Sequence, residues 1–77
     1  MTTLTVLLKS INDVKNFVRI VNDYNYDVDL ISGRYVVDGK SIMGIFSLDL
    51  ASPIEVHIHA AEAADLVGAL QPFVTES

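Results

Sequence analysis

The sequence predicts an α+β fold in which helices pack on one face of a four-stranded antiparallel sheet. Three observations predict it. Segments with strand-like alternation and segments with helical apolar spacing follow one another in the order β-α-β-β-α-β-α. A two-residue turn between the second and third strands makes them antiparallel neighbours. The 77 residues, 51% of them hydrophobic, suffice for one small domain over residues 1–77, with too few charges for a disordered chain.

The first two expected elements are a strand and an amphipathic helix. Residues 3–9 are rich in Thr, Val and Leu and predict the strand. Ser10 is expected to cap the helix, and Asp13, three residues on, to return the hydrogen bond in a capping box. Residues 22–25 end the helix. Its apolar residues recur at helical spacing and predict one buried stripe: Ile11, Val14, Phe17, Val18 and Val21.

A hairpin is expected next. Residues 27–31 and 34–38 alternate as half-buried strands do, and Ser32 and Gly33 between them predict a two-residue turn. Such a turn places four apolar residues on one face in two cross-strand pairs: Leu30 with Tyr35 and Val28 with Val37.

The second helix and the last strand follow. Residues 41–48 predict a short helix that begins at Ser41, and Gly44 limits it to two turns. Residues 54–60 alternate between apolar and polar side chains and predict a strand that starts after Pro53.

The chain is expected to finish with an Ala-rich helix. Its inner face carries Ala63, Leu66, Val67 and Leu70. Pro72 should end the helix near Leu70, because proline removes a backbone donor and clashes with the preceding turn. Residues 73–77 are expected to fray, unless Phe73 folds back on the core.

Composition and charge exclude several function classes. Without cysteine there is neither a disulfide framework nor a thiolate metal site. No segment approaches the ~20 apolar residues of a membrane span, and the start lacks a signal peptide, so a cytoplasmic location is expected. The net charge of −5 lies in residues 45–77, which contain no Lys or Arg, and disfavours nucleic-acid and membrane partners. No catalytic triad, phosphate loop or cofactor fingerprint predicts an enzyme or a bound cofactor.

Two histidines form the one pattern that suggests a metal. His57 and His59 lie two residues apart, on the same face of the last strand as Glu55. A metal site needs three or four convergent ligands, and Glu55 is the only obvious third one. We therefore expect a solvated sheet face and no metal centre.

Residues 39–48, Gly-Lys-Ser-Ile-Met-Gly-Ile-Phe-Ser-Leu, resemble the regulatory-serine segment of HPr, the phosphocarrier protein of the bacterial sugar phosphotransferase system. Residues 24–30 resemble the segment leading into the second strand of that family, and residues 55–58 resemble its fourth strand. The resemblance runs without gaps from residue 10 to residue 60. It implies the HPr fold, an open-faced sandwich with strand order 1-4-2-3 and three helices on one face.

The sequence departs from HPr where the family carries phosphate. The His-Ala-Arg-Pro segment of HPr aligns with Ser10-Ile11-Asn12-Asp13. Ser10 thus replaces the phosphoacceptor histidine, Asn12 replaces the arginine that helps hold the phosphoryl group, and Asp13 adds a negative charge. Because a serine phosphate is a stable ester and a poor donor, histidine phosphocarrier activity is not expected. The chain resembles HPr-like proteins that lack the histidine, keep the regulatory serine and act in carbon catabolite control.

The resemblance also implies a regulatory site and partners. Ser41 aligns with the serine that the HPr kinase/phosphorylase phosphorylates, and Lys40 would be a neighbour of that phosphate. Ile42, Met43 and Phe46 align with an exposed surface that docks partner proteins. Besides the kinase, candidate partners are a catabolite-control transcription regulator and proteins of the phosphotransferase system.

Other interpretations of these residues remain open. Ser41 is also a good helix N-cap, and apolar residues of a short helix are often core. The chain could be a docking or assembly module without phosphorylation, or a phosphocarrier that uses an atypical residue such as His57 or His59.

Overall fold

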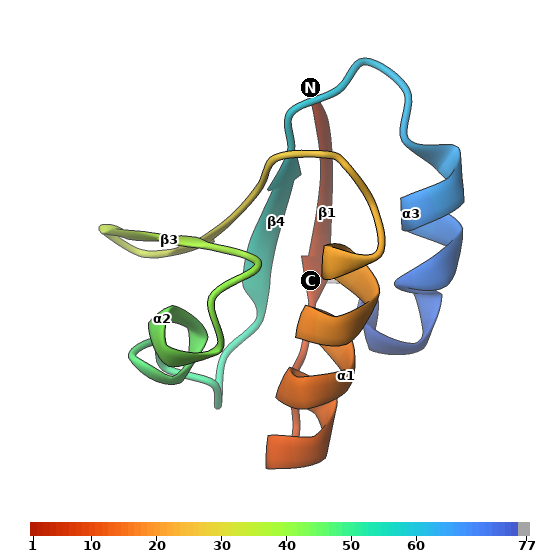
Figure 1. Ribbon diagram of the computed structural model, residues 1–77. Helices are drawn as coiled ribbons and strands as arrows, with labels where there is room; N and C mark the ends of the chain where they lie inside the picture. The colour runs from red at the N-terminus through yellow and green to blue at the C-terminus, as the bar shows by residue number, and fades with distance from the viewer. Residues whose placement is uncertain (76–77) are drawn as a thin grey trace.

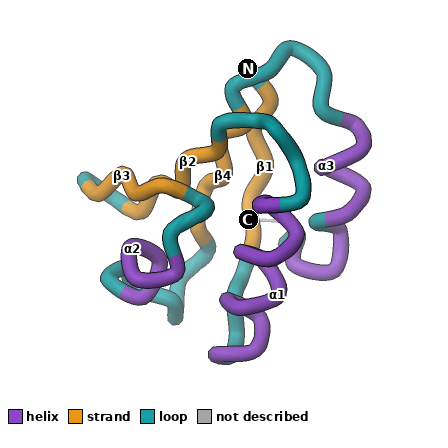
Figure 2. Tube along the Cα trace, viewed as in Figure 1, coloured by secondary structure: helices purple, strands orange, loops and turns teal. Residues whose placement is uncertain are grey.

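Four antiparallel strands form one sheet, and the helices lie against one of its faces (Figures 1 and 2). The computed structural model describes residues 1–75, and the strand order is β1-β4-β2-β3. The elements are β1 Thr2–Val6, α1 Ile11–Asn22, β2 Val28–Ser32, β3 Tyr35–Asp38, α2 Ile42–Phe46, β4 Ile54–Ile58, α3 Ala64–Ala69 and the 3₁₀ helix η1 Gln71–Phe73. The expected fold class, element order and strand order are confirmed.

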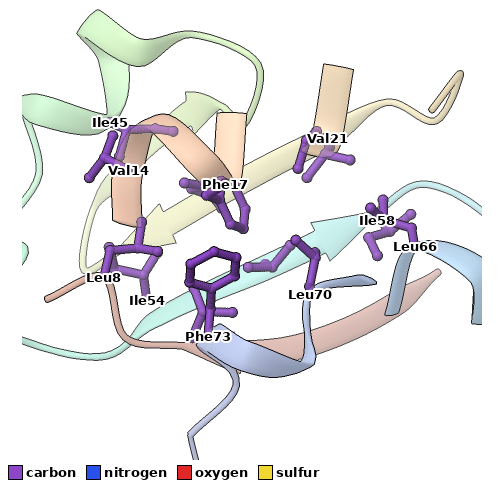
Figure 3. Packing of buried hydrophobic residues seen from close by; sticks show 14 of the residues in the cluster. Leu8, Val14, Phe17, Val21, Ile45, Ile54, Ile58, Leu66, Leu70 and Phe73 are labelled. Atoms are coloured by element: carbon purple, nitrogen blue, oxygen red, sulfur yellow. The ribbon is translucent and has the colours of Figure 1, made fainter. Parts of the chain in front are cut away.

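β4 organises the core because it pairs with both β1 and β2. Its residues alternate as expected: Ile54, Val56 and Ile58 are buried, whereas Glu55 and His57 face the open side of the sheet. The buried side chains pack against one residue or more from every helix, among them Phe17 of α1 and Leu66 of α3 (Figure 3). No helix within residues 1–75 is long and apolar enough to cross a membrane.

The start of α1 confirms Ser10 as the cap. The Ser10 Oγ accepts the Asp13 N–H at 3.1 Å. The Asp13 carboxylate accepts the Lys9 N–H at 2.9 Å, one residue before the expected position. Val14, Phe17 and Val21 are buried. The expected burial of Ile11 is wrong: as the first residue of α1 it lies at the end of the helix and is 63% exposed.

The β2–β3 hairpin turns one residue later than expected. Gly33 has φ +59°, which suits the first central position of a two-residue turn, and glycine adopts this conformation without a Cβ clash. The observed register pairs Leu30 with Val37 and Ser32 with Tyr35, so the expected pairs Leu30–Tyr35 and Val28–Val37 are wrong. Because the register differs by two residues, every side chain keeps its expected face.

The C-terminal segment folds back on β1. Leu70 caps the end of α3, as Pro72 predicts, and Phe73 packs edge-to-face on Phe17 at 6.0 Å (Figure 3). The Phe73 carbonyl accepts the Leu7 N–H at 2.9 Å, and the Thr75 N–H donates to the Thr5 carbonyl at 2.9 Å. The expected fraying is therefore wrong for residues 73–75, and the alternative, that Phe73 folds back on the core, is confirmed. Residues 76–77 lie outside the described part.

Three elements also end two residues or more before their expected ends. β1 ends at Val6 instead of residue 9, because its partner strand β4 begins opposite Val6, at Ile54. α2 ends at Phe46 instead of residue 48, with Ser47 as its C-cap. β4 ends at Ile58, two residues before its expected end.

Candidate functional site

Ser41 sits where the chain leaves β3 and enters α2. It is half-buried, and its Oγ accepts the Gly44 N–H at 3.1 Å. Its carbonyl accepts the Ile45 N–H at 3.1 Å, and its own N–H donates to the Asp38 carbonyl at 3.0 Å. Ser41 is thus the N-cap of α2, and the backbone around its hydroxyl is held at both ends.

Gly44 makes room for this arrangement. A Cβ at residue 44 would lie 3.2 Å from the Ser41 Oγ and 3.3 Å from the Val37 Cβ, closer than ordinary contacts. A glycine in the middle of a helix normally destabilises it, by about 1 kcal/mol relative to alanine. Here its small size lets α2 approach β3 closely and leaves space beside the Ser41 hydroxyl.

Lys40 precedes Ser41 in the chain, but its ammonium group is held elsewhere. The Lys40 Nζ donates to the Tyr24 carbonyl at 3.2 Å, in the loop after α1. The Lys40 N–H donates to the Asp38 carboxylate at 2.9 Å. For the ammonium group to reach a phosphate on Ser41, it would have to leave the Tyr24 carbonyl.

Four apolar side chains from α1 and α2 form an exposed or half-buried surface, which we call the α1–α2 surface: Ile11, Ile42, Met43 and Phe46. Met43 is 79% exposed and Phe46 is 41% exposed, whereas Ile42 is half-buried and packs against the core. A hollow of about 340 Å³ lies between the start of α1 and the end of α2. Its walls are Leu8, Lys9, Ser10, Ile11, Phe46, Leu50 and Ala51.

Ile11 and Leu50 are the members of this region that sequence reasoning missed. Ile11 fits the apolar spacing of α1, which predicts burial, and Leu50 stands in a loop without a pattern. The exposure of Ile11 could have been predicted from its position directly after the Ser10 cap. The first residue of a helix lies at the end of the helix, where its side chain can extend past the packed face.

Ser10 lies on the rim of the same hollow and is exposed. Asn12 is also exposed, and the Asp13 carboxylate is engaged by the Lys9 N–H. This helix start therefore presents a hydroxyl, an amide and a carboxylate. It offers neither the imidazole nucleophile nor the guanidinium group that phosphoryl transfer through a histidine would use.

The two histidines lie on a different part of the molecule. His57 Nε2 is 3.2 Å from Glu55 Oε1 on the open face of β4, and His59 Nε2 is 2.7 Å from Asp29 Oδ2 of β2. Each imidazole therefore has its own carboxylate partner. Within residues 1–75, no group of three or more His, Asp or Glu side chains is placed to hold a metal ion.

The sequence matches one family model, PTS-HPr, described as "PTS HPr component phosphorylation site", over residues 11–76. The chain therefore belongs to the HPr family of the phosphotransferase system. HPr itself is a phosphocarrier and not an enzyme. Proteins of this system are the partners that the family implies. Ser10 lies just outside the matched residues.

Solved HPr structures share the fold. The phosphocarrier protein HPr from Bacillus anthracis is 25% identical, with a TM-score of 0.72 and 96% of each chain covered. HPr-C-His from Thermoanaerobacter tengcongensis is 21% identical, with a TM-score of 0.78, 91% of this chain and 86% of that chain covered. The histidine-containing phosphocarrier protein of a Mycoplasma is 10% identical, with a TM-score of 0.75, 92% of this chain and 89% of that chain covered. No curated protein sequence matches the chain.

Proposed function

We propose that this chain is a regulatory HPr-family protein of carbon catabolite control that binds other proteins and is switched by phosphorylation of Ser41. Phosphate is not carried at residue 10, where the chain has a serine. The partners would be the HPr kinase/phosphorylase and a catabolite-control transcription regulator. Lys40, Ile42, Met43 and Phe46 would be the contact residues.

The observation that supports this proposal is the position of Ser41 at the start of the helix that carries the exposed apolar side chains. The Ser41 Oγ already faces the Gly44 N–H. Met43 and Phe46 follow Ser41 within the next two helical turns and are exposed. A modification at Ser41 therefore changes the charge beside the surface that a partner would contact.

A phosphate on Ser41 would change both the charge and the hydrogen-bonding groups at the start of α2. It adds a charge of about −1.5 to −2 and three acceptor oxygens, and the first backbone N–H groups of α2 are suitable donors. α2 itself has no charged residue between Ile42 and Phe46, so the charged side chains nearest in sequence to the phosphate would be Lys40 and Asp38, which precede Ser41. A partner with basic side chains around an apolar socket would distinguish the two forms.

The test is the intact mass of the protein after incubation with ATP and HPr kinase. We expect one added phosphate on the wild type and none on Ser41→Ala. Ser10→Ala is the matched control, because it also removes a serine that caps a helix and should still be labelled. An ordinary HPr in the same reaction shows that the kinase is active.

Two results would contradict the proposal. Absence of label on the wild type, with the ordinary HPr labelled, would leave the docking module without phosphorylation as the better interpretation. Label acquired from phosphoenolpyruvate through enzyme I, and lost in His57→Ala or His59→Ala, would indicate a phosphocarrier that uses an atypical residue.

A further inference from the structure

The two edges of the sheet differ in how they are covered. The C-terminal segment runs beside β1, where Val74 bridges to Val6 and Thr75 bonds to Thr5. At the opposite edge, β3 pairs with β2 alone, and no other described strand lies against its outer side (Figure 1). An uncovered edge strand is a template for pairing with another chain, and natural edges are commonly blocked by lysine, proline or a bulge. The four residues of β3, Tyr-Val-Val-Asp, contain no lysine or proline.

The hydrogen-bonding pattern shows which backbone groups of β3 are free to pair. Antiparallel pairs alternate between hydrogen-bonded and non-hydrogen-bonded. The Gly39 N–H donates to the Val28 carbonyl at 2.8 Å, so the backbone groups of Gly39 point toward β2. Because the direction alternates along the strand, the backbone groups of Val37 and Tyr35 also point toward β2. Val36 then presents its own N–H and C=O at the outer edge.

The side chains at this edge are apolar and exposed. Tyr35 is 70% exposed and Val36 is 62% exposed. Val36 lies opposite the half-buried Ile31 on the open face of the sheet, and Tyr35 is on the helix-bearing face with Val37. Both faces of the edge therefore offer apolar surface next to unpaired backbone.

We propose that β3 pairs with β3 of a second copy of this chain, antiparallel and centred on Val36. In this register Val36 faces Val36 of the other copy, and Tyr35 faces Val37. Arg34 faces Asp38 at one end, and Asp38 faces Arg34 at the other, so the sequence Arg-Tyr-Val-Val-Asp is complementary to itself in charge. The two sheets would join into one sheet of eight strands with two-fold symmetry.

This charge pattern is the reason to assign a second copy and not an unrelated peptide. Arg34, the turn residue directly before β3, and Asp38, the last residue of β3, match an antiparallel copy at both ends of the contact. A parallel copy would bring like charges together. The contact involves few residues, so the dimer is expected to be weak and to form in the micromolar to millimolar range of protein concentration.

The first test is sedimentation velocity of the full chain over that concentration range. We expect the wild type to dimerise with rising concentration, and Val36→Lys to stay monomeric. Thr3→Lys is the matched control, because Thr3 is an exposed strand residue at the other edge of the sheet. A wild type that stays monomeric throughout, or a Val36→Lys protein that dimerises as the wild type does, would overturn the proposal.

The register has its own test. Arg34→Asp alone places two carboxylates opposite each other at both ends of the contact, and Asp38→Arg alone places two arginines there. Each variant should therefore dimerise at least tenfold more weakly than the wild type. An equimolar mixture restores attraction between the two different chains and should form heterodimers. Since Asp38→Arg also loses the bond to the Lys40 N–H, association in the mixture is the decisive readout. A mixture that stays monomeric, or that resembles the average of its components, would show that this register is wrong.

Discussion

Two serines in this chain have the same local role and different surroundings. Ser10 and Ser41 each accept an N–H three residues later at 3.1 Å. Ser10 is exposed, and its first turn already contains Asp13, which would repel a phosphate. Ser41 is half-buried, and the first turn of α2 carries no acidic residue. The capping role follows from the local sequence in both cases, whereas the difference between the two sites depends on what packs around them.

Tyr26 links the loop before β2 to α3 and gives a prediction at the scale of one residue. Its hydroxyl donates to Asp65 Oδ1 at 2.9 Å. This hydrogen bond, with partial desolvation and the Asp65 charge, raises the pKa of Tyr26 above its ordinary value of about 10. Because the pKa in the folded state exceeds that in the unfolded state, the stabilisation is present below the unfolded pKa and is lost as the pH rises through the folded pKa.

We expect Tyr26→Phe to lower the melting temperature slightly at neutral pH and to weaken the loss of stability in alkaline solution. Thermal unfolding followed by circular dichroism across neutral to alkaline pH measures this. Tyr35→Phe is the matched control, since Tyr35 is exposed and its hydroxyl donates no hydrogen bond within residues 1–75. Equal alkaline profiles for Tyr26→Phe and the wild type would count against the contribution of the hydrogen bond.

At the scale of elements, the strand register was the property that local patterns left uncertain. Alternation in residues 27–38 predicts two strands and their faces correctly, because each strand has a period of two. The turn position depends on which residue takes a positive φ, and within the described residues only Gly33 does so. Ser32 is therefore the last residue of β2, and Tyr35 is the first residue of β3, where it is exposed.

The C-terminal segment yields the prediction at this scale. Phe73 is 8% exposed and contacts Phe17 edge-to-face, and its neighbours pair with the edge of β1. Removing a buried aromatic side chain costs about 3–5 kcal/mol, so Phe73→Ala should lower the free energy of unfolding by an amount in that range. It should also speed hydrogen exchange at the Leu7 and Thr75 amides, because the segment that holds them loses its anchor.

Urea unfolding measures the first effect and amide hydrogen exchange the second. Pro72→Ala is the control, because Pro72 is exposed and should change the free energy of unfolding by no more than about 1 kcal/mol. If both variants lost equally little stability, the C-terminal segment would not be the anchor that the contacts indicate.

At the scale of the whole molecule, the α1–α2 surface brings together residues from two distant parts of the chain. Ile11 comes from α1, whereas Met43 and Phe46 come from α2. Between these exposed residues, Ile45 is fully buried and anchors α2 to the core (Figure 3). A short helix can therefore hold one face in the core and present the other to a partner.

The prediction for this surface separates binding from stability. Met43→Ala should change the free energy of unfolding by no more than about 0.5 kcal/mol, whereas Ile45→Ala on the same helix should cost about 2–5 kcal/mol. In the kinase reaction proposed above, Met43→Ala and Phe46→Ala should both slow phosphorylation of Ser41 at low substrate concentration. Glu62→Ala, an exposed change on the loop before α3, is the control for the rate. Unchanged rates in both α2 variants would remove this surface from the kinase contact.

Much of the candidate site was accessible to sequence reasoning, and its gaps have physical causes. Ser41 and Met43 were found because residues 39–48 resemble a known segment and because caps have local signals. The burial of Ile11 was predicted wrongly, because helical spacing shows which side of a helix is apolar but not where the helix extends beyond the sheet that it covers. The engagement of Lys40 by the Tyr24 carbonyl, 16 residues away in sequence, leaves no local signal at all.

The sequence by itself determined the order of the elements, the faces of the strands, the two serine caps and the break at Pro72, because each depends on residues within a turn or two. The tertiary structure alone decided the hairpin register, the return of Phe73 to the core, the carboxylate partner of His59 and the exposure of Ile11. These features arise where distant segments compete for the same space and the same backbone groups, and local patterns carry no information about that competition.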